Sequence, residues 1–227
     1  VEIKNVKSFK EQVLLKLDDE FNILIGPNGG GKSNLLDIVT IVLRSVFLKG
    51  YKIETAGSKQ KAINQYTPFN SLASQLEKFI GDTSDSVINI TLKVTKEDIE
   101  NIETFKNHKE TFDLAKHQIT NNSDPIAEDF INDWKPGNLS KGQLLKYTIK
   151  NNELANPEAG TSEYYYLKYL NRFEYFVLLA REIDTVNINP IFIYFSPYRG
   201  QGDHNLTATV SQNYWEQLSG YYNSTSR

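Results

Sequence analysis

Cysteine and methionine are absent from this 227-residue chain, and histidine occurs only three times. Without cysteine the chain can form neither a disulfide framework nor a thiolate metal site, which is typical of proteins in a reducing compartment. No stretch approaches the roughly 18 consecutive apolar residues that a membrane-spanning helix requires. We therefore expect a cytoplasmic protein without a membrane partner.

An excess of either charge is missing as well. The formal net charge is -3 at pH 7, so the chain has no overall attraction to nucleic acid, and any DNA contact would need a local patch. Residues 44–61 are locally basic, but a run of like charge is more often a solvated surface loop, and we favour that interpretation over a phosphate-binding patch. His108 and His117 are spaced too far apart to share one helix face, so no zinc site is predicted.

One glycine-rich stretch carries the clearest chemistry. Gly26, Gly31, Lys32 and Ser33 satisfy the pattern G-x-x-x-x-G-K-[ST], which is the phosphate loop of nucleotide-binding proteins. Glycines let the backbone approach an anion closely, so successive N–H groups can point at phosphate oxygens. Lys32 is then predicted to contact the β- and γ-phosphates, and the Ser33 hydroxyl to ligate Mg²⁺.

The flanking sequence has the context that this loop requires. A short apolar segment, 21–25, predicts a strand before the loop, and 33–48 predicts a helix after it. Apolar residues cover most of that helix, which indicates burial on several sides. Similar patterns predict the remaining strands and helices of an α/β fold. The other expected strands are 1–9 (turning at Lys7-Ser8), 13–17, 86–95, 144–150 and 190–195, and the other helices are 69–80, 96–120 (N-capped by Thr95, with Asp98 three residues on) and 163–183.

Two short strands before the loop strand are the order found in ABC-type ATPases. Residues 4–9 (Lys-Asn-Val-Lys-Ser-Phe) and 26–36 (Gly-Pro-Asn-Gly-Gly-Gly-Lys-Ser-Asn-Leu-Leu) resemble the amino-terminal part of the RecF/RecN/SMC branch of that group. The branch carries "I-x-N-F-[KR]-S-F" and then "G-P-N-G-[SA]-G-K-S-N-[LI]-[LI]". The chain departs from the pattern at Val6 and Gly30, neither of which alters the phosphate chemistry. The close resemblance covers about the first fifth of the chain.

The resemblance implies an ABC ATPase-like head with P-loop NTPase fold, in which an antiparallel lobe and a parallel core form a mixed sheet carrying helical insertions. It implies ATP and Mg²⁺ as ligands, with Lys32 catalytic and Asn28 near the γ-phosphate. Lys7 and Phe9 are weaker nucleotide candidates, and a turn cation and a core aromatic are equally good interpretations of them. The expected nucleotide-binding residues are Gly26, Pro27, Asn28, Gly29, Gly30, Gly31, Lys32, Ser33 and Asn34.

A second site segment is expected after the strand 190–195. Gln201-Gly202 resembles the Q-loop of SMC-like heads, whose glutamine contacts Mg²⁺ and the attacking water; Gln201 is therefore a metal and catalytic candidate beside Ser33. The alternative is a Pro/Gly surface loop with an incidental glutamine. Arg199 is a lower-ranked phosphate or interface candidate.

Other parts of an ABC site are not recognisable in the sequence. Residues 176–182 superficially resemble a Walker B strand but continue a helical period, and 218–220 echo the signature motif too soon after 201. We therefore expect residues 1–227 to be one amino-terminal head lobe with insertions within 50–160, and the Walker B and signature parts to lie elsewhere. The absence of any methionine suits a processed start, omitted residues or a piece of a longer protein.

The resemblance implies a homodimer or higher oligomer in which ATP lies between two heads, and hydrolysis that drives DNA-associated work. That work would be DNA repair and maintenance, or anti-phage defence of the OLD, Septu or Gabija type with an attached or separate nuclease. The polar, Asn- and Lys-rich stretch 50–156 resembles the defence group more closely. The alternative functions are a non-catalytic nucleotide-gated interaction module and a transporter-type ABC subunit, the latter disfavoured by Lys7-Ser8-Phe9 and Asn34-Leu35.

Overall fold

The computed structural model describes residues 1–17, 22–56, 60–66, 76–112, 114, 137–183 and 188. All of these belong to one compact unit, Val1–Ile188. The predicted strand 190–195 and the loop around Gln201 lie outside the described residues.

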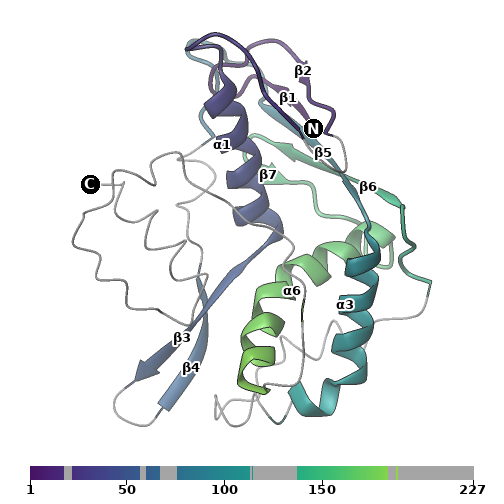
Figure 1. The fold of residues 1–227 in the computed structure, drawn as a ribbon. Helices are drawn as coiled ribbons and strands as arrows, with labels where there is room; N and C mark the ends of the chain where they lie inside the picture. The colour runs from purple at the N-terminus through teal and green to yellow at the C-terminus, as the bar shows by residue number, and fades with distance from the viewer. Residues whose placement is uncertain are drawn as a thin grey trace. The chain divides into compact units, whose positions relative to one another are not determined.

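A five-stranded sheet forms the frame of the unit (Figure 1). Its order is β2-β1-β5-β6-β7, and each neighbouring pair is antiparallel. The strands are β1 Glu2–Lys4, β2 Val13–Leu14, β5 Val87–Lys93, β6 Leu144–Lys150 and β7 Glu153–Leu154. β5 and β6 confirm the strands predicted at 86–95 and 144–150, and they bring segments far apart in sequence beside β1.

Alternating apolar residues give the sheet one buried face. On β6 every second residue is buried (Leu145, Tyr147 and Ile149), and the register sets Ile149 opposite Ile88 of β5. Ile88 also lies opposite Ile3 of β1. A period of two is what a half-buried antiparallel strand requires, so the core side of this sheet follows directly from the sequence.

Three long helices are described. α1 Lys32–Val42 continues without a break into a π-helical turn, η1 Leu43–Phe47, which confirms the helix predicted after the phosphate loop. α6 Ser162–Ile183 confirms the helix predicted at 163–183, and α3 Lys96–Asn107 begins at the predicted capping box. Thr95 Oγ1 accepts from the Asp98 amide at 3.1 Å, and the Asp98 carboxylate accepts from the Thr95 amide at 2.8 Å.

Aromatic rings join α3 to α6, which lie side by side in Figure 1. Phe105 of α3 stacks on Phe176 of α6 with ring centroids 4.2 Å apart, and Phe112 meets Phe176 edge-on. Phe47 of η1 meets Tyr147 of β6 edge-on at 5.0 Å, so the end of the phosphate-loop helix is packed against the sheet. Such ring pairs add stability beyond the burial of their apolar area.

Four predicted elements are wrong in whole or in part. Residues 44–61 are not a surface loop: after η1 they enter β3 Gly50–Ala56, which pairs antiparallel with β4 Gln60–Tyr66. The loop was predicted from charge alone, and charge indicates which side chains are solvated but not whether the backbone pairs with another strand. Tyr51, Ile53 and Ile63 are residue types that favour strands. The two-stranded sheet is separate from the five-stranded one.

The other three corrections concern one helix that is interrupted and two elements that do not form in the described residues. The helix predicted at 96–120 is interrupted, because His108 leaves the helical conformation (φ -105°, ψ 19°) after α3 ends at Asn107 and before the chain turns helical again at 109–112; residues 115–120 lie outside the described residues. Of the helix predicted at 69–80, the described residues 76–80 are not helical. Residues 22–25 form no strand, since no described segment pairs with them and a strand needs a neighbour for its backbone groups.

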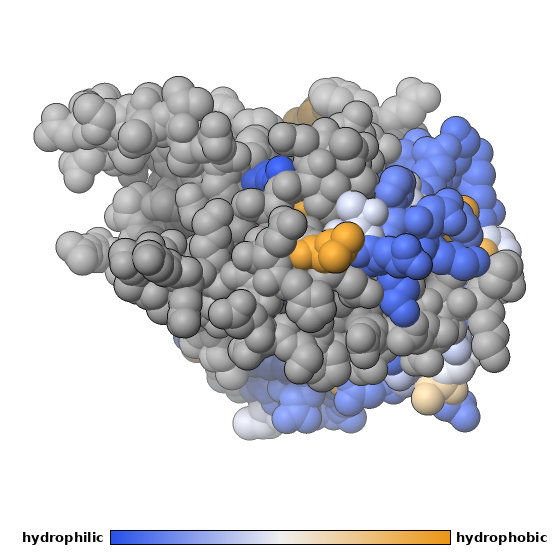
Figure 2. All heavy atoms as spheres, turned by 90° about the horizontal axis from the view of Figure 1, so that it is seen from below, coloured by the Kyte–Doolittle hydropathy of each residue, from blue (hydrophilic) through white to orange (hydrophobic). Residues whose placement is uncertain are grey.

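The described surface is mainly hydrophilic on the face drawn in Figure 2, where apolar residues form small separate spots. Over the described residues the large exposed apolar side chains are Leu14, Leu17, Ile23, Ile25, Leu36, Ile80, Leu114 and Leu144. None of the helices described is at once long and apolar enough to cross a membrane.

Candidate phosphate-binding site

The glycine-rich segment forms a loop that closes directly onto α1. Gly31 caps the helix in the left-handed conformation (φ 81°, ψ 3°), and Gly29 also has a positive φ of 80°. The Gly30 amide donates to the Pro27 carbonyl at 3.1 Å, which turns the chain within the loop. Positive φ at two positions explains why glycine is required there, since a Cβ is strained in this region.

The first helical hydrogen bond runs from the Leu35 amide to the Gly31 carbonyl at 2.9 Å. The amides of Lys32, Ser33 and Asn34 precede it, and helix N-termini present such N–H groups and a positive dipole end to anions. The loop residues 26–30 are exposed, so a phosphate can reach these groups from solvent. The geometry therefore fits a phosphate ligand.

Lys32 reaches back across the loop. Its Nζ donates to the carbonyl oxygens of Gly26 at 2.8 Å and Pro27 at 2.7 Å. Both acceptors lie at the start of the loop, so the ammonium group is held over the residues that a polyphosphate would contact. A positive charge in this place favours an anion bound to the loop amides.

The turn 6–9 lies against the outer side of the loop. Asn34 Nδ2 donates to Ser8 Oγ at 3.0 Å, and Lys7 Nζ lies 3.8 Å from Asp37 Oδ2 on α1. A Cβ added at Gly31 would lie 3.2 Å from both Phe9 Cζ and Ser8 Oγ. The structure thus brings Lys7 and Phe9 to the loop, where Lys7 pairs with a helix carboxylate and Phe9 packs against Gly31.

Sequence reasoning missed Ser8 and Asp37. Ser8 lies between Lys7 and Phe9 in the stretch that carries the family resemblance, so its position was a usable signal. Asp37 follows Asn34 by three residues, which puts both side chains on one face of α1 and toward the turn. Only the packing of the turn against the helix shows that these residues meet.

The remaining predicted site residues divide into two groups. Asn28 lies in the exposed loop and Ser33 in the first turn of α1, and their roles toward the γ-phosphate and Mg²⁺ stay predictions. Gln201 and Arg199 lie outside the described residues, as does His117. Over the described ranges, no group of three or more histidine, cysteine or acidic residues could hold a metal ion. Residues 176–182 are helical within α6, which confirms that they are not a Walker B strand.

Comparison with known sequences identifies a family and several partial relatives. The profile of the family described as "AAA domain" matches residues 1–196. The chain is 41% identical over 56 residues to "Structural maintenance of chromosomes protein 1" of Arabidopsis thaliana, covering 24% of this chain and 5% of that protein. It is 46% identical over 43 residues to "Chromosome partition protein Smc" of Methanocaldococcus jannaschii (19% and 4%).

A longer match, 33% identical over 100 residues, is to "Chromosome partition protein Smc" of Fusobacterium nucleatum, covering 42% of this chain and 8% of that protein. The chain therefore spans less than a tenth of the length of these curated relatives. No solved structure matches the chain significantly.

Proposed function

The chain belongs to the AAA domain family of P-loop NTPases, and on that basis we propose that it binds ATP·Mg²⁺ at residues 26–34 as part of an ATPase head. The observation that carries this proposal is the position of Lys32, whose ammonium group is held by the Gly26 and Pro27 carbonyls across a loop of exposed glycines. The likeness to SMC proteins supports the choice of ATP.

Each residue of the loop has a defined task in this proposal. The amides of Gly29 to Ser33 hold the β- and γ-phosphates, Lys32 neutralises their charge, and Asn28 lies toward the γ-phosphate. The Ser33 hydroxyl is the Mg²⁺ ligand on α1, and Gln201 is proposed as a second ligand that also orients the attacking water. When bound, Mg²⁺ withdraws charge from the phosphate oxygens.

We propose that hydrolysis needs more than these residues. The segment 22–25 leads into the loop with Ile23 67% and Ile25 90% exposed, although apolar β-branched residues favour a paired and buried strand. We infer that this segment pairs within a parallel core in the complete ATPase head. The Walker B and signature groups would come with that core and from a second head, in a homodimer or higher oligomer with ATP between the heads.

The names of the relatives point to chromosome maintenance and partition, so we propose DNA-associated work for the complete ATPase. Within that scope, DNA repair and anti-phage defence with a nuclease partner are the two roles that the resemblance of residues 4–9 and 26–36 suggests. A non-catalytic nucleotide-gated module is the alternative. Loss of ATP binding in Lys32→Ala with full biological activity would favour that alternative.

The direct test is titration of the purified chain with fluorescent Mg·mant-ATP. Lys32→Ala removes a charged donor and should weaken binding by about tenfold or more, because hydrogen bonds to charged groups contribute about 1.5–3 kcal/mol. Lys146→Ala, on the exposed face of β6, is the matched control and should bind as the wild type does. Equal affinity of wild type and Lys32→Ala would overturn the site.

A turnover assay on the same chain tests the incomplete-site part of the proposal. The chain alone should hydrolyse ATP far more slowly than the roughly 1–1,000 per second that is typical of enzymes. A rate inside that range would show that these residues suffice for catalysis and would refute the need for a second head.

A further inference from the structure

The turn beside the phosphate loop begins at a buried asparagine with an unusual backbone. Asn5 is 0% exposed and has a φ of 53°, and Lys7 within the turn has a φ of 49°. Val6 and Phe9 close the turn by exchanging backbone hydrogen bonds of 3.0 and 2.9 Å. Non-glycine residues with positive φ are uncommon, and asparagine tolerates this region better than most.

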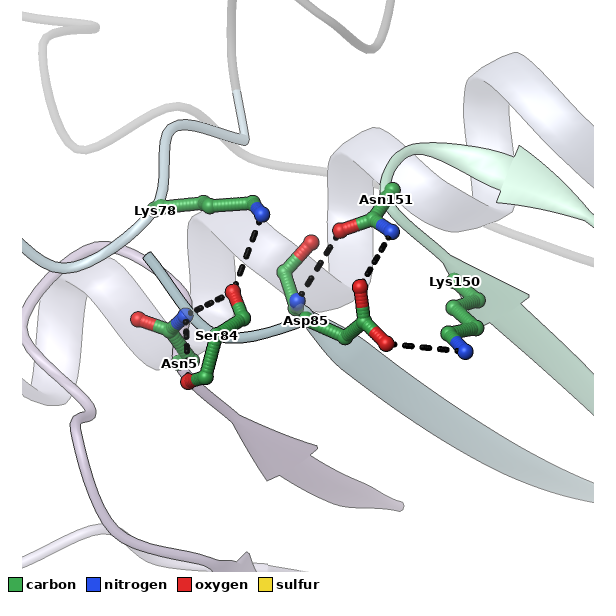
Figure 3. A network of polar contacts seen from close by, with 7 residues as sticks. Asn5, Lys78, Ser84, Asp85, Lys150 and Asn151 are labelled. Carbon is green, nitrogen blue, oxygen red and sulfur yellow. Dashed lines mark hydrogen bonds and ion pairs between the residues drawn. The ribbon is translucent and has the colours of Figure 1, made fainter. Parts of the chain in front are cut away.

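The side chain of Asn5 ties this turn to the segment before β5. Its Nδ2 donates to the Ser84 carbonyl at 2.7 Å and to Ser84 Oγ at 3.2 Å, and its Oδ1 accepts from the Phe79 amide at 3.1 Å. Figure 3 shows Asn5 and Lys78 both directed at Ser84. One asparagine therefore uses its donor and its acceptor on two points of the same segment.

The backbone of the turn is held by the same segment. The Lys7 amide donates to the Glu77 carbonyl at 2.7 Å, next to the Asn5 contacts. On its other side the turn meets the site through Ser8, which accepts from Asn34, and through Phe9, which packs against Gly31. The turn is thus fixed on one side by 77–84 and touches the phosphate loop with the other.

We propose that Asn5 is a positioning residue for the phosphate loop and acts through Ser8 and Phe9. Without its hydrogen bonds, the turn loses its hold on 79–84 and the strained φ at Asn5 has no compensation. Ser8 and Phe9 then no longer restrict the backbone at Gly31. The N–H groups of the loop can therefore adopt orientations in which they do not all point at one phosphate. Binding groups keep a productive geometry only when neighbouring residues fix their positions by packing and hydrogen bonds.

The test compares two substitutions at Asn5 with the same substitutions at Asn151. Asn5→Gly keeps the positive φ and removes the side chain, whereas Asn5→Asp keeps the shape but has no donor for Ser84. Asn151 is a matched control, because it too has a positive φ, of 49°, and it anchors the neighbouring segment. Its Oδ1 accepts from the Ser86 amide at 3.2 Å, and its Nδ2 donates to Asp85 at 2.7 Å, at the far end of the network in Figure 3.

Affinity for Mg·mant-ATP is the first readout, and it rests on the proposed function. Both Asn5 variants should bind about five- to tenfold more weakly, the equivalent of one or two hydrogen bonds, while the Asn151 variants stay within about twofold of wild type. A merely structural role would lower the unfolding temperature of both sets and leave the affinity of the folded protein unchanged. Wild-type affinity in Asn5→Gly and Asn5→Asp would overturn the proposal.

Amide hydrogen exchange at residues 29–34 is the second readout, and it needs no nucleotide. Exchange there should be faster in Asn5→Gly than in Asn151→Gly, and Ser8→Ala should add little to Asn5→Gly because both act through one contact. If the wild-type chain binds no nucleotide, the proposed function fails while this comparison still decides the role of Asn5. Unchanged exchange in Asn5→Gly would refute it.

Discussion

Arg44, in the π-helical turn that follows the phosphate-loop helix, forms a buried ion pair with Glu174 of α6. The two side chains are only 8% and 3% exposed. Burial raises the pKa of the Glu174 carboxyl, and the guanidinium of Arg44 opposes that shift. The pair connects α1, whose first turn belongs to the site, with the helix that carries much of the core.

Breaking this pair on one side should destabilise the protein strongly. Glu174→Gln removes the carboxylate that neutralises Arg44 in the interior, and such changes cost about 3–5 kcal/mol. Urea unfolding measures the loss. Glu100→Gln in the exposed Lys96–Glu100 pair is the control and should leave stability unchanged within error.

The double variant Arg44→Met/Glu174→Leu gives a sharper result. Removing both charges together should recover most of the stability lost in Glu174→Gln, because two apolar residues of similar volume often replace a buried ion pair without loss. Strictly additive losses for the two sites would show that the pair does not act as a unit.

Alanine at two glycines of the phosphate loop separates backbone strain from contact with the turn. Gly29 and Gly31 have nearly equal φ values of 80° and 81°, so alanine brings about 1–2 kcal/mol of strain at each. A Cβ at Gly29 meets nothing within 4 Å, whereas one at Gly31 lies 3.2 Å from Phe9 and Ser8. Gly31→Ala should therefore lower the free energy of unfolding more than Gly29→Ala does.

Removing the ring of Phe9 should relieve the steric clash in Gly31→Ala and leave Gly29→Ala unaffected. Phe9→Leu is expected to restore part of the stability of Gly31→Ala and none of that of Gly29→Ala. Equal losses in the two glycine variants, with no selective recovery, would mean that the turn does not press on Gly31.

Asp98 is expected to stabilise the fold more than an ordinary helix cap does. Its carboxylate belongs to the capping box of α3 and also accepts from the Tyr166 and Tyr169 hydroxyls at 2.9 and 3.2 Å. Asp98→Ala should cost about 3 kcal/mol or more, since it removes a buried charged acceptor together with the cap. Thermal and urea unfolding measure this loss.

Thr161→Ala is the matched control at the other long helix. Thr161 Oγ1 accepts from the Tyr164 amide at 3.3 Å in the first turn of α6, and losing such a cap costs about 1 kcal/mol. Equal losses for Asp98→Ala and Thr161→Ala would contradict a wider role for Asp98.

The same tyrosines predict how stability changes at alkaline pH. Burial, and next the charge of Asp98, raise the pKa of Tyr166 and Tyr169 above the ordinary tyrosine value. The unfolded chain releases these protons near pH 10, while the folded chain keeps them, so their contribution is complete below about pH 10 and is lost as pH rises further. Above about pH 10, each tyrosine should lower the free energy of unfolding by up to about 1.4 kcal/mol per pH unit.

The measurement is the pH dependence of urea unfolding between pH 8 and 11. Tyr166→Phe/Tyr169→Phe should start from a lower stability, because the hydrogen bonds to Asp98 are gone, but should fall less steeply above pH 10. Identical slopes for wild type and the double variant would show that these hydroxyls do not stay protonated in the fold.

Features that depend on neighbouring residues were predicted well. The phosphate loop follows from glycine spacing and Lys32-Ser33, the Thr95–Asp98 capping box from a three-residue spacing, and β6 from its alternation. Each of these is decided by backbone geometry within one turn or one strand, so local sequence contains the necessary information. The break at His108 was not predicted, because no glycine or proline signals it there.

Contacts between residues far apart in the sequence were decided by the tertiary structure alone. The pairing of β1 with β5, the Arg44–Glu174 ion pair, and the contacts of Asn5 with Ser84 join segments whose sequences contain no mark of each other. Residues 22–25 show that a local pattern is not sufficient: they have the apolar pattern of a strand, but no described segment pairs with them and they form no strand. The sequence by itself thus determined that a glycine-rich loop precedes α1, and binding of phosphate by residues 26–34 stays a prediction. The tertiary structure decided what supports that loop, because packing and hydrogen bonding across the chain depend on which segments meet in space.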